Sequence, residues 1–374
     1  MTCAPNLGHT RRLVRLAAAA AAAAISRQRA LYCLWEITHR CNARCAMCAL
    51  WRRPARAADE LRLDAIEVIL ERLWAHGCRA LNLSGGEPTL RDDLEGIVQA
   101  AARRGFWTSM VTNGSGLTRA RVAALRQSGL DSLLVSVDAA DARLHDRRRG
   151  MPGGHARALR CLGWLGEEFL SDHRTGGMMV VLSRENVSDL GALLDLARRL
   201  HVSVAVQPYH AKKTGSGDAI AALAPETLAI LTAAAREKRL MLSSRRYLAS
   251  LADPARVANA SCRAGRAYFS IDPYGGLHPC VDQPAVGHAL RDDFSVLHSA
   301  AARTCVQDCP GCWYSFRGET DLALTPAGYL DKLRLALATR HRRPRRGVSG
   351  VEELSASTLT TDSRETGALS CEEA

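Results

Sequence analysis

Three cysteines, Cys41, Cys45 and Cys48, form a C-x3-C-x2-C arrangement directly after an apolar run. Thiolates are soft ligands, and three of them on one loop can each bind a different corner of a compact iron–sulfur cluster. A four-iron cluster held by three thiolates leaves one iron open to a chelating small molecule. The alternative is a structural zinc ion, for which His39 is a candidate fourth ligand.

A second motif, Gly85-Gly86-Glu87-Pro88, follows the apolar run 79–83. Paired glycines permit close approach of the backbone, and Glu87 offers a carboxylate to an ammonium group. Alone, this tetrapeptide is typical of a turn. Its place after a predicted strand and downstream of the three cysteines favours a role in binding.

A second group of cysteines lies in the C-terminal third of the chain: Cys262, Cys280, Cys305, Cys309 and Cys312. Eight of the 13 cysteines thus fall into two groups, which indicates metal ligation in a reducing compartment rather than disulfides. The segment 274–280 is predicted to form a hairpin that presents Cys280. A four-cysteine zinc site would use the same ligands as an iron–sulfur cluster, so the spacing leaves both metals open.

The elements that must position these residues follow a regular pattern, because short apolar runs alternate with amphipathic segments from residue 31 to about 210. The predicted strands are 31–37, 79–83, 107–112, 132–137, 178–182 and 202–207. The predicted helices between them are 61–75, 91–104, 118–128, 154–169 and 187–200. Such strands pair in parallel through crossover helices, which predicts an α/β fold with a partial (β/α)6 barrel over 31–215. Chemistry in parallel sheets sits at the C-terminal strand ends, where both motifs fall.

The rest of the chain is predicted to add smaller units to this barrel. These are an N-terminal Ala/Arg-rich helix over 1–30, linking helices over 216–258, a small Cys-rich domain over 259–318, a C-terminal helix over 319–339 and a disordered tail over 340–374.

The N-terminal segment combines Arg11 and Arg12 with the alanine run 17–24 and has a weak likeness to a twin-arginine export signal. Alanine is barely hydrophobic enough to insert into a membrane, and no run reaches the roughly 18 apolar residues that a spanning helix needs. We therefore expect a cytoplasmic protein whose N-terminal helix lies on the protein or makes peripheral contact with a membrane. Export is the alternative.

The composition is typical of a soluble globular enzyme, with 374 residues of which 47% are apolar and 24% charged. The formal charge is +12. Residues 1–30 contribute five arginines and residues 340–346 contribute five more, whereas residues 351–374 carry a net charge of −5. Only 5% of the residues are aromatic, so there are few stacking platforms for bases. The composition favours a solvated basic surface and gives no strong nucleic-acid signal.

The two N-terminal motifs together resemble the radical S-adenosylmethionine (radical SAM) superfamily, over roughly residues 31–210. The resemblance implies that Cys41, Cys45 and Cys48 hold a [4Fe–4S] cluster whose open iron is chelated by S-adenosylmethionine. Met47 departs from the family pattern, which usually has an aromatic residue there against the adenine. A thioether supplies apolar contact as well, so we expect altered cofactor packing rather than lost activity.

The resemblance also implies residues that contact S-adenosylmethionine. These are Gly85, Gly86 and Glu87 at the methionine ammonium, Asn113 in the loop after the third strand, Ser136 and Asp138 on the ribose side, and Arg149 at the methionine carboxylate. Arg149 belongs to the segment 145–150, which is similar to a loop of the family.

The second cysteine group resembles the auxiliary-cluster module called SPASM, or its shorter twitch form, over roughly residues 260–316. A full SPASM module has about seven cysteines and two clusters, whereas the five here suffice for one fully ligated [4Fe–4S] cluster. We expect Cys262, Cys280, Cys309 and Cys312 as its ligands, because a C-x2-C pair behind a hairpin suits one cluster face. Cys305 is then spare or exchanges with a ligand.

The resemblance implies an enzyme that reductively cleaves S-adenosylmethionine and abstracts hydrogen from a substrate C–H bond, in a net oxidation or modification. It implies a flavodoxin- or ferredoxin-type electron donor. The substrate is a peptide or a small molecule, and the short segment ahead of the first strand weakens the case for a fused leader-peptide-binding domain. The alternative is a non-enzymatic zinc protein with a structural or nucleic-acid-associated role.

Overall fold

The computed structural model describes residues 7–25, 30–170, 174–214, 223–237, 239–253 and 262–331. The predicted tail over 340–374 and the last part, 332–339, of the predicted helix over 319–339 lie outside these ranges. Parts of the linking segment 216–258 lie outside them as well.

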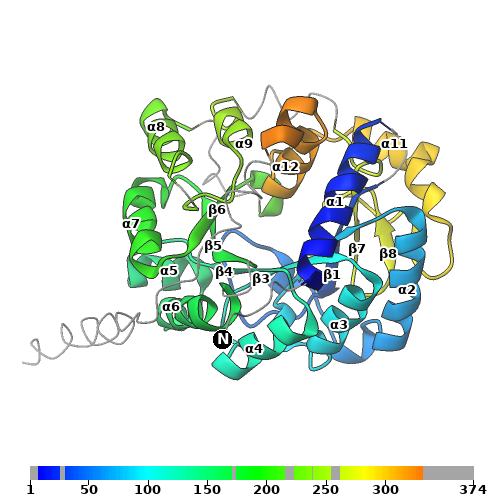
Figure 1. The fold of residues 1–374 in the computed structure, drawn as a ribbon, viewed down its shortest axis with the longest axis horizontal. Helices are drawn as coiled ribbons and strands as arrows, with labels where there is room; N and C mark the ends of the chain where they lie inside the picture. Colours follow the sequence, from blue (N-terminus) through cyan, green and yellow to red (C-terminus); the bar gives the residue numbers. More distant parts are fainter. Residues whose placement is uncertain are drawn as a thin grey trace, which may run out of the picture.

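The central feature is a nine-stranded sheet in the order β6-β5-β4-β3-β2-β1-β7-β8-β9 (Figure 1). Its first six strands are parallel to their neighbours and follow the chain in sequence order. They are β1 (Tyr32–Thr38), β2 (Ala80–Gly85), β3 (Trp107–Thr112), β4 (Ser132–Ser136), β5 (Thr175–Leu182) and β6 (Ser203–Pro208). The predicted α/β fold with a partial (β/α)6 barrel is therefore confirmed.

Helices form the crossover connections between consecutive strands and bury one apolar face against the sheet. They are α2 (Leu63–His76), α3 (Leu94–Arg104), α4 (Arg119–Ser128), α5 (Ala142–Arg149), α6 (Gly154–Trp164), extended by one π-helical turn (Leu165–Phe169), and α7 (Leu190–Leu200). Helix α4 has typical capping residues at both ends. Thr118 Oγ1 accepts a hydrogen bond from the Arg121 amide at its start, and Gly129 ends the helix with a φ of 106°.

One helix of the barrel was not predicted. The segment 145–150, interpreted as a loop, is instead the last part of α5 and the glycine that follows it. The Asp141 side chain caps this helix by accepting from the Leu144 amide, and Gly150 ends it with a φ of 54°. These two residues are the signals that identify the helix, because they are a typical N-cap and C-terminal glycine at matching spacing.

The C-terminal region extends the same sheet beyond β1. Strand β7 (Tyr268–Ile271) pairs with β1 in parallel, and β8 (Gly276–His278) and β9 (Gly287–His288) continue in antiparallel order. Strands β7 and β8 form a hairpin just ahead of Cys280. The helices of this half are α8 (Pro225–Ala234), α9 (Arg245–Ser250), α11 (Ala300–Gln307) and α12 (Ser315–Ala323), with a 3-10 segment at Phe294–His298.

The N-terminal segment forms helix α1 (Leu7–Ile25), which contacts β3 and is drawn in dark blue across the sheet in Figure 1. Asp131, fully buried at the start of β4, holds the helix in place. Its carboxylate contacts His9 Nδ1 at 2.7 Å and Arg12 Nη2 at 2.7 Å, and it also accepts from the Thr108 amide. Within the described residues, no helix is long and apolar enough to cross a membrane.

Candidate functional site

The loop after β1 carries the three N-terminal cysteines at the C-terminal edge of the sheet. Cys45 is buried among Ala43, Met47, Met151 and Tyr209, and the partly buried Cys41 and Cys48 pack against the same apolar cluster. Three soft donors around one apolar site are chemically suited to an iron–sulfur cluster.

A single zinc ion would require its ligands to converge on one point. Across the part of the chain that the structure describes, no three Cys, His, Asp or Glu side chains are grouped as ligands of one metal ion. His39, the candidate fourth ligand, instead contacts Glu36 with 2.9 Å between Nε2 and Oε2. The thiolates of a four-iron cluster bind different iron atoms, so they need not converge on one point.

Burial makes the thiols of Cys41 and Cys45 weaker acids. It raises the pKa of Cys41 to about 11, and it also raises the pKa of Cys45. A cluster binds thiolates, so its assembly must displace protons from both groups. Arg149 lies next to Cys45, with 4.0 Å between Nη1 and Sγ, and its positive charge opposes the effect of burial there.

The end of β2 packs directly on the cysteine loop, and this explains the two glycines. A Cβ on Gly85 would lie 2.1 Å from the Thr38 carbonyl oxygen, and one on Gly86 would lie 2.1 Å from that of Arg40. The Gly86 amide donates to Thr38 O at 2.8 Å, and the Glu87 amide donates to Arg40 O at 2.8 Å. The close approach that Gly-Gly permits is therefore between two segments of the chain itself.

The Glu87 side chain lies inside the protein and is only 2% exposed. Its Oε1 accepts from the Thr89 amide at 3.1 Å and from the hydroxyls of Thr89 and Thr112, both at 2.6 Å. Its Oε2 accepts from the Asn113 amide at 2.7 Å. Glu87 therefore joins the ends of β2 and β3, and its predicted contact with the methionine ammonium stays a prediction.

Asn113 links this carboxylate to the cysteine loop. Its side-chain amide donates to Asn42 Oδ1 at 2.8 Å, and Asn42 donates in turn to Ser115 Oγ at 2.7 Å. Sequence reasoning missed Asn42. Its place directly after Cys41 is the only signal in the sequence, because the partner lies 71 residues away.

Asp138 and Arg149, predicted on the ribose side and at the methionine carboxylate of S-adenosylmethionine, contact each other. Arg149 Nε lies 2.7 Å from Asp138 Oδ2, and Asp138 Oδ1 accepts from the Val181 amide at 2.9 Å. The Asp138 side chain is fully buried, and its contact with the ribose stays a prediction. Ser136, at the end of β4, is also buried, and its ribose contact stays a prediction.

In the second cysteine group, Cys262 and Cys312 lie close enough to Cys280 to contribute to the raised pKa of its thiol. Burial raises the pKa of Cys280 to about 12. Cys262 Sγ lies 3.0 Å from the Tyr268 hydroxyl, and Arg317 Nη1 lies 3.9 Å from Cys312 Sγ.

The other two cysteines of this group lie at one end of α11. Cys305 is inside the helix, and Cys309 follows it in the segment that leads to Cys312. The choice of Cys309 as fourth ligand stays a prediction.

Contacts that the sequence did not predict hold the second cysteine group against the barrel. Lys213, in the turn after β6, lies 2.9 Å from Asp282 Oδ1, two residues beyond Cys280. Lys213 Nζ also lies 5.2 Å from the centre of the Tyr314 ring. Ser315 Oγ donates to Gln207 Oε1 at 2.8 Å. The segments around Cys280 and Cys312 are thus held against the C-terminal end of β6.

The fold and this cysteine site agree with a match of residues 35–197 to the family model described as "Radical SAM superfamily". The chain belongs to the radical SAM superfamily, as the resemblance predicted. Membership implies a [4Fe–4S] cluster and S-adenosylmethionine, and the three thiols on the loop after β1 are a suitable donor set for that cluster.

Two similar curated proteins have different names, one a peptide cyclase and the other a heme synthase. The chain is 32% identical over 180 residues to a PqqA peptide cyclase of Rhizobium meliloti (strain 1021), which is 47% of each protein. It is 33% identical over 185 residues to an AdoMet-dependent heme synthase of Methanosarcina barkeri (strain Fusaro / DSM 804), which is 49% of this chain and 51% of that protein. The chain thus spans about half the length of these curated relatives.

Solved structures share the fold at low identity. SuiB of Streptococcus suis bound to S-adenosylmethionine has a TM-score of 0.61 at 17% identity, with 75% of this chain and 68% of that one covered. Native anSMEcpe with bound AdoMet and a Cp18Cys peptide has a TM-score of 0.58 at 15% identity, with 83% and 96% covered. Both alignments extend beyond the barrel, so the partial barrel followed by a small Cys-rich domain is confirmed as the fold.

Proposed function

We propose that this chain reductively cleaves S-adenosylmethionine and uses the product to abstract hydrogen from a C–H bond of a peptide substrate. When bound, the cluster supplies one electron, from a flavodoxin- or ferredoxin-type donor, that splits S-adenosylmethionine into methionine and a 5′-deoxyadenosyl radical. The radical takes a hydrogen atom and leaves as 5′-deoxyadenosine, so the substrate has lost one hydrogen atom. The chain's own share is to hold the reactants and exclude water.

One observation carries this proposal. The loop of Cys41, Cys45 and Cys48 lies at the C-terminal edge of a parallel sheet and is fixed by the backbone of Gly86 and Glu87. Cofactor chemistry in parallel α/β sheets takes place at that edge. The Gly86 carbonyl and the remaining lone pair of Glu87 Oε2 are acceptors, as an ammonium group requires.

The names of similar proteins favour a peptide over a small molecule. One relative is named a peptide cyclase, and the SuiB fold is also known with a bound precursor peptide. A small-molecule substrate is the second candidate, favoured by the relative named heme synthase.

We further propose that Cys262, Cys280, Cys309 and Cys312 hold an auxiliary [4Fe–4S] cluster. A substrate radical that gives up one more electron and a proton completes a two-electron oxidation, and a nearby redox centre is a suitable acceptor. The Lys213–Asp282 contact supports this role, because it keeps the second cysteine group against the barrel's C-terminal edge.

Metal content tests the proposal against a zinc protein. Anaerobic reconstitution with iron and sulfide, followed by desalting, should give a brown protein with about eight iron atoms per chain. Cys280→Ala should retain about four of them and Cys45→Ala should also retain about four, since each change removes one site. A colourless protein that retains zinc and no iron would overturn the proposal.

A further inference from the structure

Two buried polar side chains lie directly against the second cysteine group. Tyr268 belongs to β7 and Arg317 to the first turn of α12, and each is only 1% exposed. The two elements meet, because the Tyr268 ring packs edge-on against that of Phe316 with 5.6 Å between the centroids. A buried hydroxyl and a buried guanidinium both need polar partners, so the groups around them indicate what they serve.

The Tyr268 hydroxyl contacts the thiol of Cys262, with 3.0 Å between the oxygen and Sγ. Either atom can donate while the thiol keeps its proton. A metal-bound cysteine is a thiolate without a proton, so the hydroxyl must then be the donor. Hydrogen bonds to a charged acceptor are stronger than those between neutral groups. Binding of a cluster at Cys262 would therefore strengthen this contact.

Arg317 directs its positive charge toward Cys312. Its Nη1 donates to the Cys312 carbonyl oxygen and lies 3.9 Å from the Cys312 Sγ. Its Nε faces Asp321 Oδ2 at 3.4 Å, and its guanidinium lies 5.4 Å from the centre of the Trp313 ring. An arginine side chain keeps its charge in proteins. These contacts therefore hold a permanent positive charge beside the sulfur.

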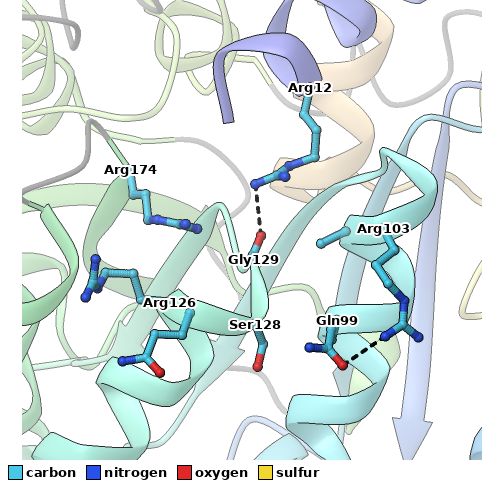
Figure 2. Close-up of a pocket in the computed structure, with 9 residues that line it drawn as sticks. Arg12, Gln99, Arg103, Arg126, Ser128, Gly129 and Arg174 are labelled. Atoms are coloured by element: carbon cyan, nitrogen blue, oxygen red, sulfur yellow. Dashed lines mark hydrogen bonds between the residues drawn. The ribbon is translucent and has the colours of Figure 1, made fainter. Parts of the chain in front are cut away.

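Arg12 shows how this chain holds another buried guanidinium through a carboxylate. Its Nη2 lies 2.7 Å from Asp131 Oδ1 and its Nε lies 2.9 Å from Oδ2. Figure 2 shows the same side chain donating to the Gly129 carbonyl oxygen. The contact of Arg317 with Asp321 is longer, at 3.4 Å, and Arg317 also faces a sulfur. Thiolates in the second cysteine group would thus add to the stabilisation of this buried charge.

Given the auxiliary cluster of the proposed function, on which this inference rests, we propose that Tyr268 and Arg317 raise its reduction potential through the sulfurs of Cys262 and Cys312. They are positioning residues, because they act on the cluster through its thiolate ligands. Reduction adds negative charge to a cluster, and hydrogen bonds and positive charge at the sulfurs stabilise that charge. A raised potential is what an electron acceptor requires.

A potentiometric titration monitored by EPR tests the proposal on the full-length chain reconstituted with iron and sulfide. Cys45→Ala serves as the parent, because it should retain only the auxiliary cluster with about four iron atoms. Adding Tyr268→Phe should keep the iron and lower the midpoint potential by about 59 mV, which is a tenfold change in the equilibrium constant for one-electron reduction. Adding Arg317→Gln should lower it at least as much, since glutamine can still donate to the Cys312 carbonyl oxygen but carries no charge.

Tyr32→Phe in the same parent is the matched control. Tyr32 is the β1 partner of Tyr268 and packs against the same apolar cluster, but its hydroxyl interacts with Asn82. It should leave the potential unchanged. If Arg317→Gln does not fold, Tyr268→Phe decides the result alone.

Three results would overturn the assignment of Tyr268: an unchanged potential in Tyr268→Phe, loss of its iron, or an equal drop in Tyr32→Phe. Absence of iron from the Cys45→Ala parent is a different failure. It would overturn the auxiliary cluster itself, and with it the tuning of its potential.

Discussion

The side-chain amide of Asn113 donates a hydrogen bond to the Asn42 side-chain oxygen at 2.8 Å, which joins the loop after β3 to the cysteine loop after β1. The Asn113 backbone amide donates to Glu87 at 2.7 Å, so one residue connects both sequence motifs. The position of the cysteine loop therefore depends on residues outside the loop.

Asn42→Ala tests this connection. Losing one hydrogen bond at each end of Asn42 should lower the free energy of unfolding by about 1 kcal/mol and loosen the cysteine loop. The reconstituted variant should then lose iron faster than wild type during desalting. Asn42→Asp is the control, because it keeps the oxygen that accepts from Asn113. Iron retention equal to wild type in the alanine variant would show that the loop is fixed by other contacts.

Glu87→Gln should destabilise the chain even without cofactor. The amide can keep its oxygen toward the Thr89 and Thr112 donors, but it then places an NH2 group against the Asn113 amide. A buried amide without its acceptor costs about 1–3 kcal/mol, measurable as a lower urea midpoint. The variant should also lose binding free energy of about the same size. Its affinity for S-adenosylmethionine should therefore weaken about tenfold or more. An unchanged urea midpoint would contradict the role of Glu87 between the β2 and β3 ends.

His145 should make stability depend on pH. Burial lowers its pKa to about 4, and the nearby charge of Arg149 contributes, while Asp138, Asp146 and His155 also face it. The unfolded chain binds a proton near pH 6.5, so stability is complete above that pH and is lost as pH falls from 6.5 toward 4.

The change in unfolding free energy between pH 7.5 and pH 5 measures this effect. His145→Gln should lose about 2 kcal/mol less than wild type over this interval. The glutamine oxygen can still accept from the Asp138 amide, which His145 Nδ1 does at 3.2 Å. Equal losses in both proteins would show that His145 does not stay neutral in the folded chain.

Comparing Cys309→Ala with Cys305→Ala tests the auxiliary ligands. Cys309→Ala should lose about four iron atoms after desalting, whereas Cys305→Ala should keep all of them. Cleavage of S-adenosylmethionine should continue in both variants. Greater iron loss from Cys305→Ala would mean that the ligand at the end of α11 is Cys305.

The six barrel strands were predictable because their apolar runs and turn signals are local. Strand β5 begins at Thr175, three residues earlier than predicted, because Gly176 and Gly177 are poor strand formers. A Cβ on Gly177 would lie 2.0 Å from the Ser203 carbonyl oxygen, so the glycine serves the close pairing of β5 and β6. That requirement depends on a partner strand and leaves no local pattern.

The residues of the candidate site differ in the same way, because some belong to a local motif and others depend on a distant partner. The cysteines and Gly85-Gly86 could be found from spacing alone, since each motif is one short segment. The Asn42–Asn113 and Asp138–Arg149 contacts depend on how separate βα units are placed side by side. Asp138 illustrates the limit, because its motif suggested a contact with the cofactor and gave no sign of its ion pair with Arg149.

The most direct test of the central claim is formation of 5′-deoxyadenosine by the anaerobically reconstituted, dithionite-reduced chain with S-adenosylmethionine. Wild type should form it, and so should the control Cys161→Ala, which changes a buried cysteine of α6 outside both groups. Cys41→Ala, Cys45→Ala and Cys48→Ala should each form none, because each removes one of only three ligands. Undiminished 5′-deoxyadenosine formation by any one of these three variants would contradict the account.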